Sequence, residues 1–113
     1  MCTSTELKII IQQLVRSVRE LFPQETPEVI LFGSYARNDA DDGSDIDVLL
    51  LMDASREEIA EKNWQVGEVA AELLLAHGIV VSPILENRDY YFTNMMLLPF
   101  FQNIQREGVR MSA

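Results

Sequence analysis

The first part of the chain repeats apolar side chains at the three- and four-residue spacing of an α-helix. A capping box opens this segment, because Glu6 stands three residues after Thr3. Pro23 closes it, since proline cannot continue a helix. We therefore predict an amphipathic helix that packs its apolar face on the core. The apolar positions are Leu7, Ile10, Ile11, Leu14, Val15, Val18, Leu21 and Phe22.

Three shorter apolar runs are typical of strands, at residues 29–32, 45–52 and 79–85. The second run is almost continuously apolar after Asp47, which favours a central strand that is covered on both faces. Pro83 removes a backbone donor from the third run, so that strand is expected at or near a sheet edge. A brief helix through Arg37 and a polar loop over 38–44 are predicted between the first two strands.

Two further helices are predicted from the same kind of pattern. Ser55 and Glu58 form a second capping box, and the helix that they open is expected to run to about His77. Gly78 follows it, at the place where a left-handed residue ends many helices. The expected inward face comprises Ile59, the stem of Lys62, Val66, Val69, Ala70, Leu73 and Leu74. Residues 99–107 are predicted as the last helix, and the order of elements indicates an α/β (α+β) fold with a small mixed sheet.

Length and composition limit the classes of protein that fit. We expect one domain over 1–113, because 113 residues suffice for one core. The formal net charge of -9 repels phosphate backbones, so general nucleic-acid binding is not expected. The longest apolar run, residues 95–101, is far shorter than the roughly 20 residues of a membrane span, and no signal peptide is recognised. Cys2 is the only cysteine, which excludes an internal disulfide and a thiolate zinc cluster, and a cytoplasmic protein is expected.

The residues with candidate chemistry lie between the first two predicted strands. Gly33 and Ser34 end one strand, and Asp45 and Asp47 open the next, with ten residues between Ser34 and Asp45. Alternation along a strand places both aspartates on one face, where they can converge on Mg²⁺, an ion that takes one or two carboxylates together with substrate phosphates. Glycine lets a phosphate approach the backbone, and the serine hydroxyl adds a hydrogen bond. Arg37 is either a further phosphate contact or the ion-pair partner of an aspartate in the following loop (Asp39, Asp41 or Asp42).

The acidic loop is open to three other interpretations. A calcium loop that began at Asp39 would place Leu50 at the twelfth position, where a glutamate is required, so it is excluded. A nucleophilic serine would need a base, and the one histidine, His77, falls at a helix end, where a solvated or capping role fits better. A solvated loop without a ligand is the remaining alternative, although the two flanking strands favour a site.

Residues 31–53 resemble the signature of the minimal nucleotidyltransferase family, which is related to DNA polymerase β. The segment GSYARNDADDGSDIDVLLLMD carries that likeness. The resemblance implies a polymerase β-like nucleotidyltransferase core with about three to four strands flanked by helices. It implies nucleotide binding by Gly33, Ser34, Arg37 and Ser44. By the same resemblance, Asp45 and Asp47 are catalytic and bind Mg²⁺ or Mn²⁺, and an NTP, with ATP preferred, is the substrate.

The chain departs from the family pattern at two positions. Asn38 replaces a glycine that is common after the arginine, and asparagine tolerates left-handed backbone angles. Ser82 stands where active members carry a third carboxylate on the next strand, and a neutral serine neither holds a metal nor accepts a proton at neutral pH. The alternatives left open for that acid are Glu86, Asp89, Asp41, Asp42 and a group on a partner.

Two functions follow from the resemblance. The first is Mg²⁺-dependent transfer of a nucleoside monophosphate from an NTP to a hydroxyl acceptor, with a HEPN-family protein or a second copy of the chain completing the acceptor site, as in toxin–antitoxin pairs. The second is an antitoxin-like module with weak or absent catalysis that acts by binding its partner. The apolar residues near the C-terminus, which serve either a partner surface or the core, are Leu97, Leu98, Phe100, Phe101 and Ile104.

Overall fold

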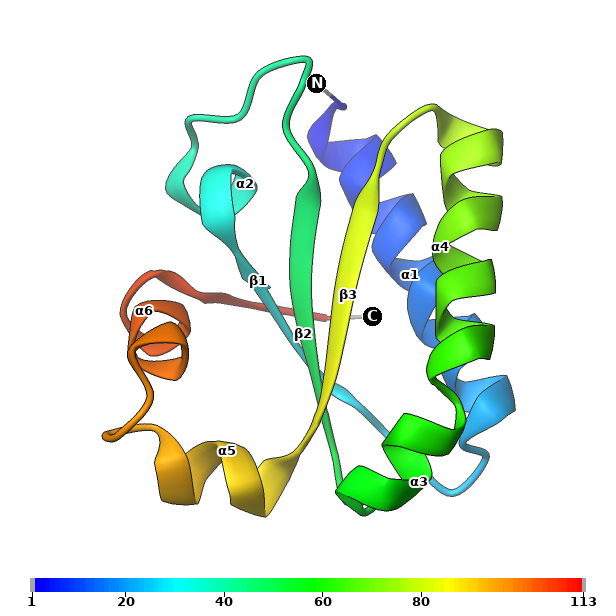
Figure 1. Cartoon of the computed structure of the whole chain (residues 1–113). Helices are drawn as coiled ribbons and strands as arrows, with labels where there is room; N and C mark the ends of the chain where they lie inside the picture. Colours follow the sequence, from blue (N-terminus) through cyan, green and yellow to red (C-terminus); the bar gives the residue numbers. More distant parts are fainter. Residues whose placement is uncertain (1, 113) are drawn as a thin grey trace.

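The structure is a computed structural model that describes residues 2–112. A four-stranded mixed sheet in the order β3-β2-β1-β4 forms its centre, with helices on both faces (Figure 1). β1 pairs with β2 and β4 in antiparallel fashion, while β2 and β3 are parallel. The elements are α1 (Ser4–Leu21), β1 (Glu28–Phe32), α2 (Gly33–Arg37), β2 (Ile46–Met52), α3 (Arg56–Glu61), α4 (Asn63–His77), β3 (Val81–Asn87), α5 (Arg88–Asn94), α6 (Pro99–Glu107) and β4 (Val109–Met111). The predicted fold class is confirmed.

The capping box that the sequence predicts at the start of α1 is present. The amide of Glu6 donates to the hydroxyl of Thr3, and the Glu6 carboxylate accepts from the Thr3 amide. These two bonds satisfy donors that a helix start leaves free. The stripe predicted for the core is buried at its centre, at Ile10, Ile11, Leu14, Val15 and Val18.

β2 lies in the middle of the sheet, as its continuous apolar run predicts. Its side chains alternate between two hydrophobic clusters, one on each face. Val48, Leu50 and Met52 pack in the cluster that contains the buried residues of α1 together with Leu73 of α4. Leu49 and Leu51 pack in the other, with Tyr91 of α5 and Phe101 of α6. Both faces of β2 are covered, so polar side chains do not alternate with apolar ones along it, which explains its continuous apolar run.

β3 occupies the sheet edge that Pro83 predicts. It begins two residues later than the apolar run and continues to Asn87. Its parallel register places Ser82 opposite Asp47 and Glu86 opposite Leu51.

The predicted helix from Ser55 to His77 is wrong in one respect, because it is interrupted at Lys62. There the backbone turns to φ -98° and ψ 3°, and the Lys62 amide bonds to Ile59 at the tighter three-residue spacing. The shorter α3 thereby packs on β3 while α4 packs on α1 and β3. Gly78 ends α4 with φ +71°, as predicted. The face expected to point inward is buried at Val66 and Leu73, but Leu74 is exposed.

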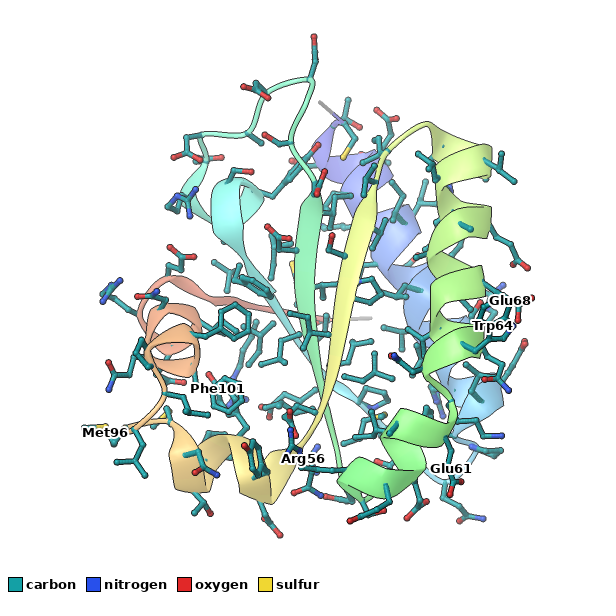
Figure 2. The ribbon with its side chains drawn as sticks, in the orientation of Figure 1. Arg56, Glu61, Trp64, Glu68, Met96 and Phe101 are labelled. Atoms are coloured by element: carbon teal, nitrogen blue, oxygen red, sulfur yellow. The ribbon has the colours of Figure 1, made fainter. Side chains whose placement is uncertain are left out.

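The C-terminal region contains two elements that the hydrophobic pattern did not predict, α5 and β4. Between them, α6 begins with Pro99, whose fixed φ suits a first helical turn. Phe101 points from α6 toward the sheet, whereas Met96 lies at the outer edge, away from it (Figure 2). The apolar C-terminal residues therefore divide, because Phe101 and Ile104 belong to the core while Leu97 is 73% exposed. No helix within residues 2–112 is long and apolar enough to cross a membrane.

Candidate active site

The two halves of the motif lie side by side at one end of the central strands. Phe32, the last residue of β1, is paired with Asp47 of β2. The chain turns directly from Phe32 into α2, so Gly33 and Ser34 are adjacent to the start of β2 (Figure 1). Antiparallel pairing thus brings together the two halves of the motif, which residues 35–44 separate in the sequence. Asp47 shares the sheet face of Leu49, which α5 and α6 cover further along.

Gly33 is required at its position for two separate reasons. Its φ of +73° is a left-handed conformation that glycine adopts without the steric cost of a Cβ. In addition, a Cβ on Gly33 would collide with Oδ2 of Asp47 and lie 3.2 Å from its Cγ. The phosphate-binding turn that the sequence predicts is therefore in direct contact with one of the two predicted metal ligands.

The carboxylate of Asp47 is influenced by its burial and by the charges around it. Partial burial raises the pKa of Asp47, and the negative charge of Asp45 raises it further. The guanidinium of Arg37 opposes this pKa shift, while the carboxylate of Glu107 adds to it. Asp45 is exposed and Asp47 is half-buried, so one of the two carboxylates has lost part of its hydration. A half-buried carboxylate beside a second acid is stabilised in its charged form when a cation binds.

These features fit a magnesium ion that accompanies a nucleotide. Mg²⁺ is bound through one or two carboxylates and completes its octahedron with water and phosphate oxygens. Across residues 2–112, no group of three or more His, Cys, Asp and Glu side chains is placed to hold a metal ion. The donor set therefore resembles a site that is completed by substrate, rather than a cage built only from protein.

Glu107, the last residue of α6, is the residue that the sequence interpretation missed. Its Oε1 accepts a hydrogen bond from the Gly33 amide at 3.2 Å. Its Oε2 lies 3.2 Å from a guanidinium nitrogen of Arg37. One sequence signal could have drawn attention to it, since a negative charge at a helix C-terminus is opposed by the helix dipole.

Arg37 closes α2 on the other side of the motif. It forms ion pairs with Glu107 and, at 3.3 Å, with Asp39, one of the partners that the sequence left open. These carboxylates raise the pKa of Arg37, with the Asp39 hydrogen bond as the largest cause. The next residue, Asn38, has φ +66°, so the left-handed conformation that was expected of it is confirmed.

Comparison with known proteins decides the family. The profile of the nucleotidyltransferase domain family matches residues 11–100. The chain is 30% identical over 98 residues to "Putative protein adenylyltransferase MJ0604" of Methanocaldococcus jannaschii, a match that covers 87% of this chain and 90% of the relative. It is 30% identical over 104 residues to "Putative protein adenylyltransferase MJ0141" of the same organism, covering 92% and 97% of the two chains. The chain belongs to the nucleotidyltransferase domain family.

A solved structure supports the same fold. A chain in a structure titled "Crystal structure of the toxin-antitoxin with AMP-PNP" superimposes with a TM-score of 0.56 at 22% sequence identity. The match covers 88% of this nucleotidyltransferase and 69% of that chain. This likeness concerns the fold, while the family profile and the two archaeal relatives confirm the sequence-based recognition of the family.

Two of the acids considered as the third carboxylate of this nucleotidyltransferase, Glu86 and Asp89, lie far from Asp47. Glu86 lies four residues beyond Ser82 on β3, about 13 Å away at ~3.3 Å per residue. Its carboxylate is buried and pairs with Arg56 at 3.0 Å, so it serves the opposite end of the sheet. Asp89 follows still further on, in the exposed first turn of α5. Neither Glu86 nor Asp89 can therefore serve as the third acid beside Asp47.

Asp41 and Ser44 of the acidic loop are engaged with each other. The Ser44 hydroxyl accepts from the Asp41 amide at 2.9 Å and donates to the Asp41 carboxylate at 3.2 Å. The same carboxylate accepts the Gly43 amide at 2.9 Å. These bonds hold the loop closed just before Asp45, and nucleotide binding by Ser44 remains a prediction.

A cleft of about 450 Å³ lies beside Asp45, between the acidic loop and the turn that follows α4. Tyr35, Asp42 and His77 are among the residues that line it. His77 is not placed as a catalytic base for a serine, since its Nε2 lies 2.7 Å from Gln13 and links α4 to α1.

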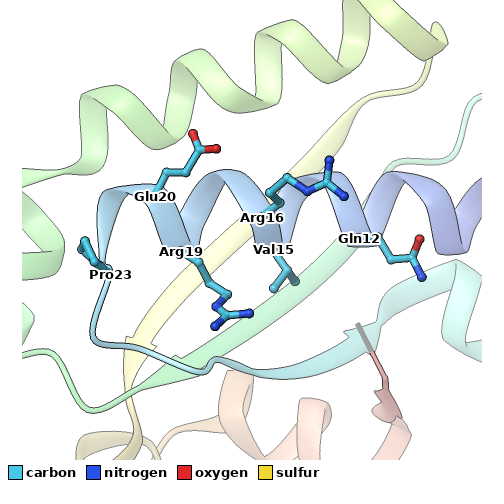
Figure 3. A pocket seen from close by; sticks show the side chains of 6 residues that line it. All are labelled: Gln12, Val15, Arg16, Arg19, Glu20 and Pro23. Carbon is cyan, nitrogen blue, oxygen red and sulfur yellow. The ribbon is translucent and has the colours of Figure 1, made fainter.

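A larger hollow of about 610 Å³ runs along α1 and carries no aspartate pair (Figure 3). Its lining residues are Gln12, Val15, Arg16, Arg19, Glu20 and Pro23. The acids and the glycine turn that suit a metal–nucleotide complex therefore lie elsewhere, at the start of β2.

Proposed function

We propose that this protein transfers an adenylyl group from Mg·ATP to a hydroxyl group on a partner protein of the HEPN type. The contact between Gly33 and Asp47 carries the proposal, because it joins a turn suited to phosphate with a carboxylate suited to Mg²⁺. The names of the archaeal relatives, both of which specify protein adenylyltransferase, support a protein as acceptor.

Each residue of the site has a part in holding the triphosphate. Gly33 allows close approach of a phosphate oxygen, and the half-buried Ser34 offers a hydroxyl donor next to it. Arg37 supplies a guanidinium whose planar fork suits phosphate oxygens. Asp45 and Asp47 would hold Mg²⁺, which when bound offsets the negative charge that gathers on the phosphates.

The reaction breaks one bond and makes one. The acceptor oxygen bonds to the α-phosphorus, the bond from that phosphorus to the bridging oxygen breaks, and pyrophosphate leaves. Because most analyses describe the transition state of phosphoryl transfer as loose, the acceptor hydroxyl can lose its proton late, to water. Such a route does not require a carboxylate at Ser82, which lies opposite Asp47.

Position-specific labelling of ATP tests the reaction. The protein, Mg²⁺ and the product of the neighbouring gene are incubated with ATP labelled at the α- or the γ-phosphate. We expect protein-bound label from the α-position alone, and about 100-fold or more loss with Asp47→Asn, as several kcal/mol of charge stabilisation disappear. Label from the γ-position, or equal labelling by wild type and Asp47→Asn, would contradict adenylyl transfer.

A second function, neutralisation of a partner by binding alone, is favoured by the serine opposite Asp47 and by exposed apolar residues beside α6. Met96 is 75% exposed and Leu97 is 73% exposed. Buried Phe101 does not belong to this surface, so its replacement would test folding rather than binding.

Binding and catalysis can be separated with matched leucines. Leu97→Ser is compared with Leu75→Ser, a leucine on α4 that is also exposed, at 88% against 73% for Leu97. If binding alone is the function, complex formation survives Asp47→Ala and is lost with Leu97→Ser but not with Leu75→Ser. A protein that remains unbound in the presence of its neighbour would rule out this second function.

A further inference from the structure

The carboxylate of Glu107 contacts both Gly33 and Arg37, two of the groups that the proposed function assigns to phosphate. The Gly33 amide donates to Oε1 at 3.2 Å, and the Arg37 guanidinium lies 3.2 Å from Oε2. A backbone amide and a guanidinium that converge on one anion are also the donors that bind phosphate oxygens. Glu107 therefore already fills an anion position within the motif.

The placement of Glu107 is electrostatically unfavourable in two respects. It ends α6, where the helix dipole disfavours a negative charge. It also adds a third carboxylate to the neighbourhood of Asp45 and Asp47, and its charge raises the pKa of Asp47. The side chain is only 23% exposed, so solvent does not fully screen this repulsion.

We propose that Glu107 competes internally with the nucleotide, holding Gly33 and Arg37 until a triphosphate displaces its carboxylate. This inference rests on the proposed function and identifies Glu107 as a residue that sets nucleotide affinity. The single N–H of Gly33 cannot serve carboxylate and phosphate at full strength together. The free energy needed to move Glu107 away therefore lowers the affinity for a triphosphate and its magnesium ion.

Glu107→Gln separates competition from simple support of the turn. Glutamine retains an oxygen that can accept from Gly33, but it loses the charge that binds Arg37 and repels phosphate. We therefore expect Glu107→Gln to bind nucleotide more tightly, by about three- to tenfold, the scale of one nearby charge under partial screening. If Glu107 only positions the turn, the same substitution weakens binding.

The experiment is calorimetric titration with a non-hydrolysable ATP analogue and Mg²⁺. Glu68→Gln is the matched control, because it removes the same charge from the exposed outer side of α4, far from α2 (Figure 2). We expect a lower Kd for Glu107→Gln and a Kd within about twofold of wild type for Glu68→Gln. An unchanged or higher Kd for Glu107→Gln overturns the competition and leaves the proposed function standing. Absence of binding by all three proteins overturns both.

A measurement on the wild-type protein does not depend on how the variant folds. The amide resonance of Gly33 is followed by NMR while the analogue and Mg²⁺ are added. Exchange of a carboxylate for a phosphate oxygen shifts this resonance, with the signal of Gly67 in α4 as an internal control. A Gly33 resonance that stays in place while nucleotide binds elsewhere contradicts the displacement of Glu107.

Discussion

Gly33 and Asp47 approach each other so closely that the glycine has no room for a side chain. A Cβ there would collide with Oδ2 of Asp47, and the backbone φ of +73° independently favours glycine. The contact couples the turn that follows β1 to the carboxylate at the start of β2. A side chain introduced at position 33 would therefore displace the Asp47 carboxylate directly.

Replacement of Gly33 by alanine should cost more than its backbone angle alone explains. Gly78 is the control, because it has a similar φ of +71° and nothing within 4 Å of a Cβ. We expect Gly78→Ala to lower the free energy of unfolding by about 1–2 kcal/mol, and Gly33→Ala to lower it by a further ~1–3 kcal/mol from overpacking. Urea unfolding of both variants measures the difference. Equal losses of unfolding free energy in the two variants would show that the Asp47 side chain moves aside without an energetic cost.

Asp47→Asn should stabilise the fold at neutral pH while abolishing transfer. The pKa of Asp47 is raised in the folded protein by burial and by Asp45, so the folded state holds the proton more tightly than the unfolded chain. Stability from this group is therefore full below the unfolded pKa of about 3.9 and is lost as the pH rises through the raised folded value. The gain with Asn is expected to reach at most about 1 kcal/mol, since the side chain keeps solvent contact.

Thermal unfolding from pH 3 to pH 8 measures this effect. The difference between Asp47→Asn and wild type should be largest at pH 7 and disappear toward pH 3. A difference that is constant with pH would indicate a cause other than the titration of Asp47.

Ser82→Asp should increase transfer, because the parallel register places position 82 opposite Asp47. A carboxylate there can accept the hydroxyl proton, and such general-base assistance contributes about 100-fold or more where it operates. Ser82→Asn is the neutral control of similar size. Initial transfer rates for both variants decide the matter, and a gain with Asn equal to that with Asp would point to packing instead of proton transfer.

Glu86→Gln should change stability and leave transfer within about twofold of wild type. The Glu86 carboxylate is buried, pairs with Arg56 at 3.0 Å and accepts its neighbour's amide, all at the far end of β3. Loss of a charged hydrogen bond predicts a decrease of about 1.5–3 kcal/mol in unfolding free energy. A 100-fold loss of transfer in a folded Glu86→Gln protein would restore it as a candidate third acid.

The hydrophobic pattern predicted those elements whose local signals agree with their packing. The capping box at Thr3 and Glu6 and the apolar runs of β1 and β2 are examples, because local bonding and burial favour the same conformation. The break at Lys62 has no such local signal, and it separates α3, which packs on β3, from α4, which packs on α1 as well as on β3. β4 was missed because it is only three residues long and pairs with β1, which lies far away in the sequence.

The site was predictable where a motif places its parts close in sequence. Gly33 and Asp47 flank two strands that the apolar runs predict, and the pairing of those strands brings the two residues together. Glu107 reaches Gly33 from 74 positions away, and only the packing of α6 beside α2 brings it there. No sequence pattern predicts a contact between two residues that are so far apart along the chain.

Intact mass spectrometry can detect adenylyl transfer to a partner protein and its dependence on Asp45 and Asp47. The partner protein is incubated with ATP, Mg²⁺ and either wild type, Asp45→Asn or Asp47→Asn, and its mass is measured. We expect a mass increase of one or more AMP groups with wild type and none with either variant. An unmodified partner after incubation with wild type, or the same AMP addition with Asp47→Asn, would contradict it.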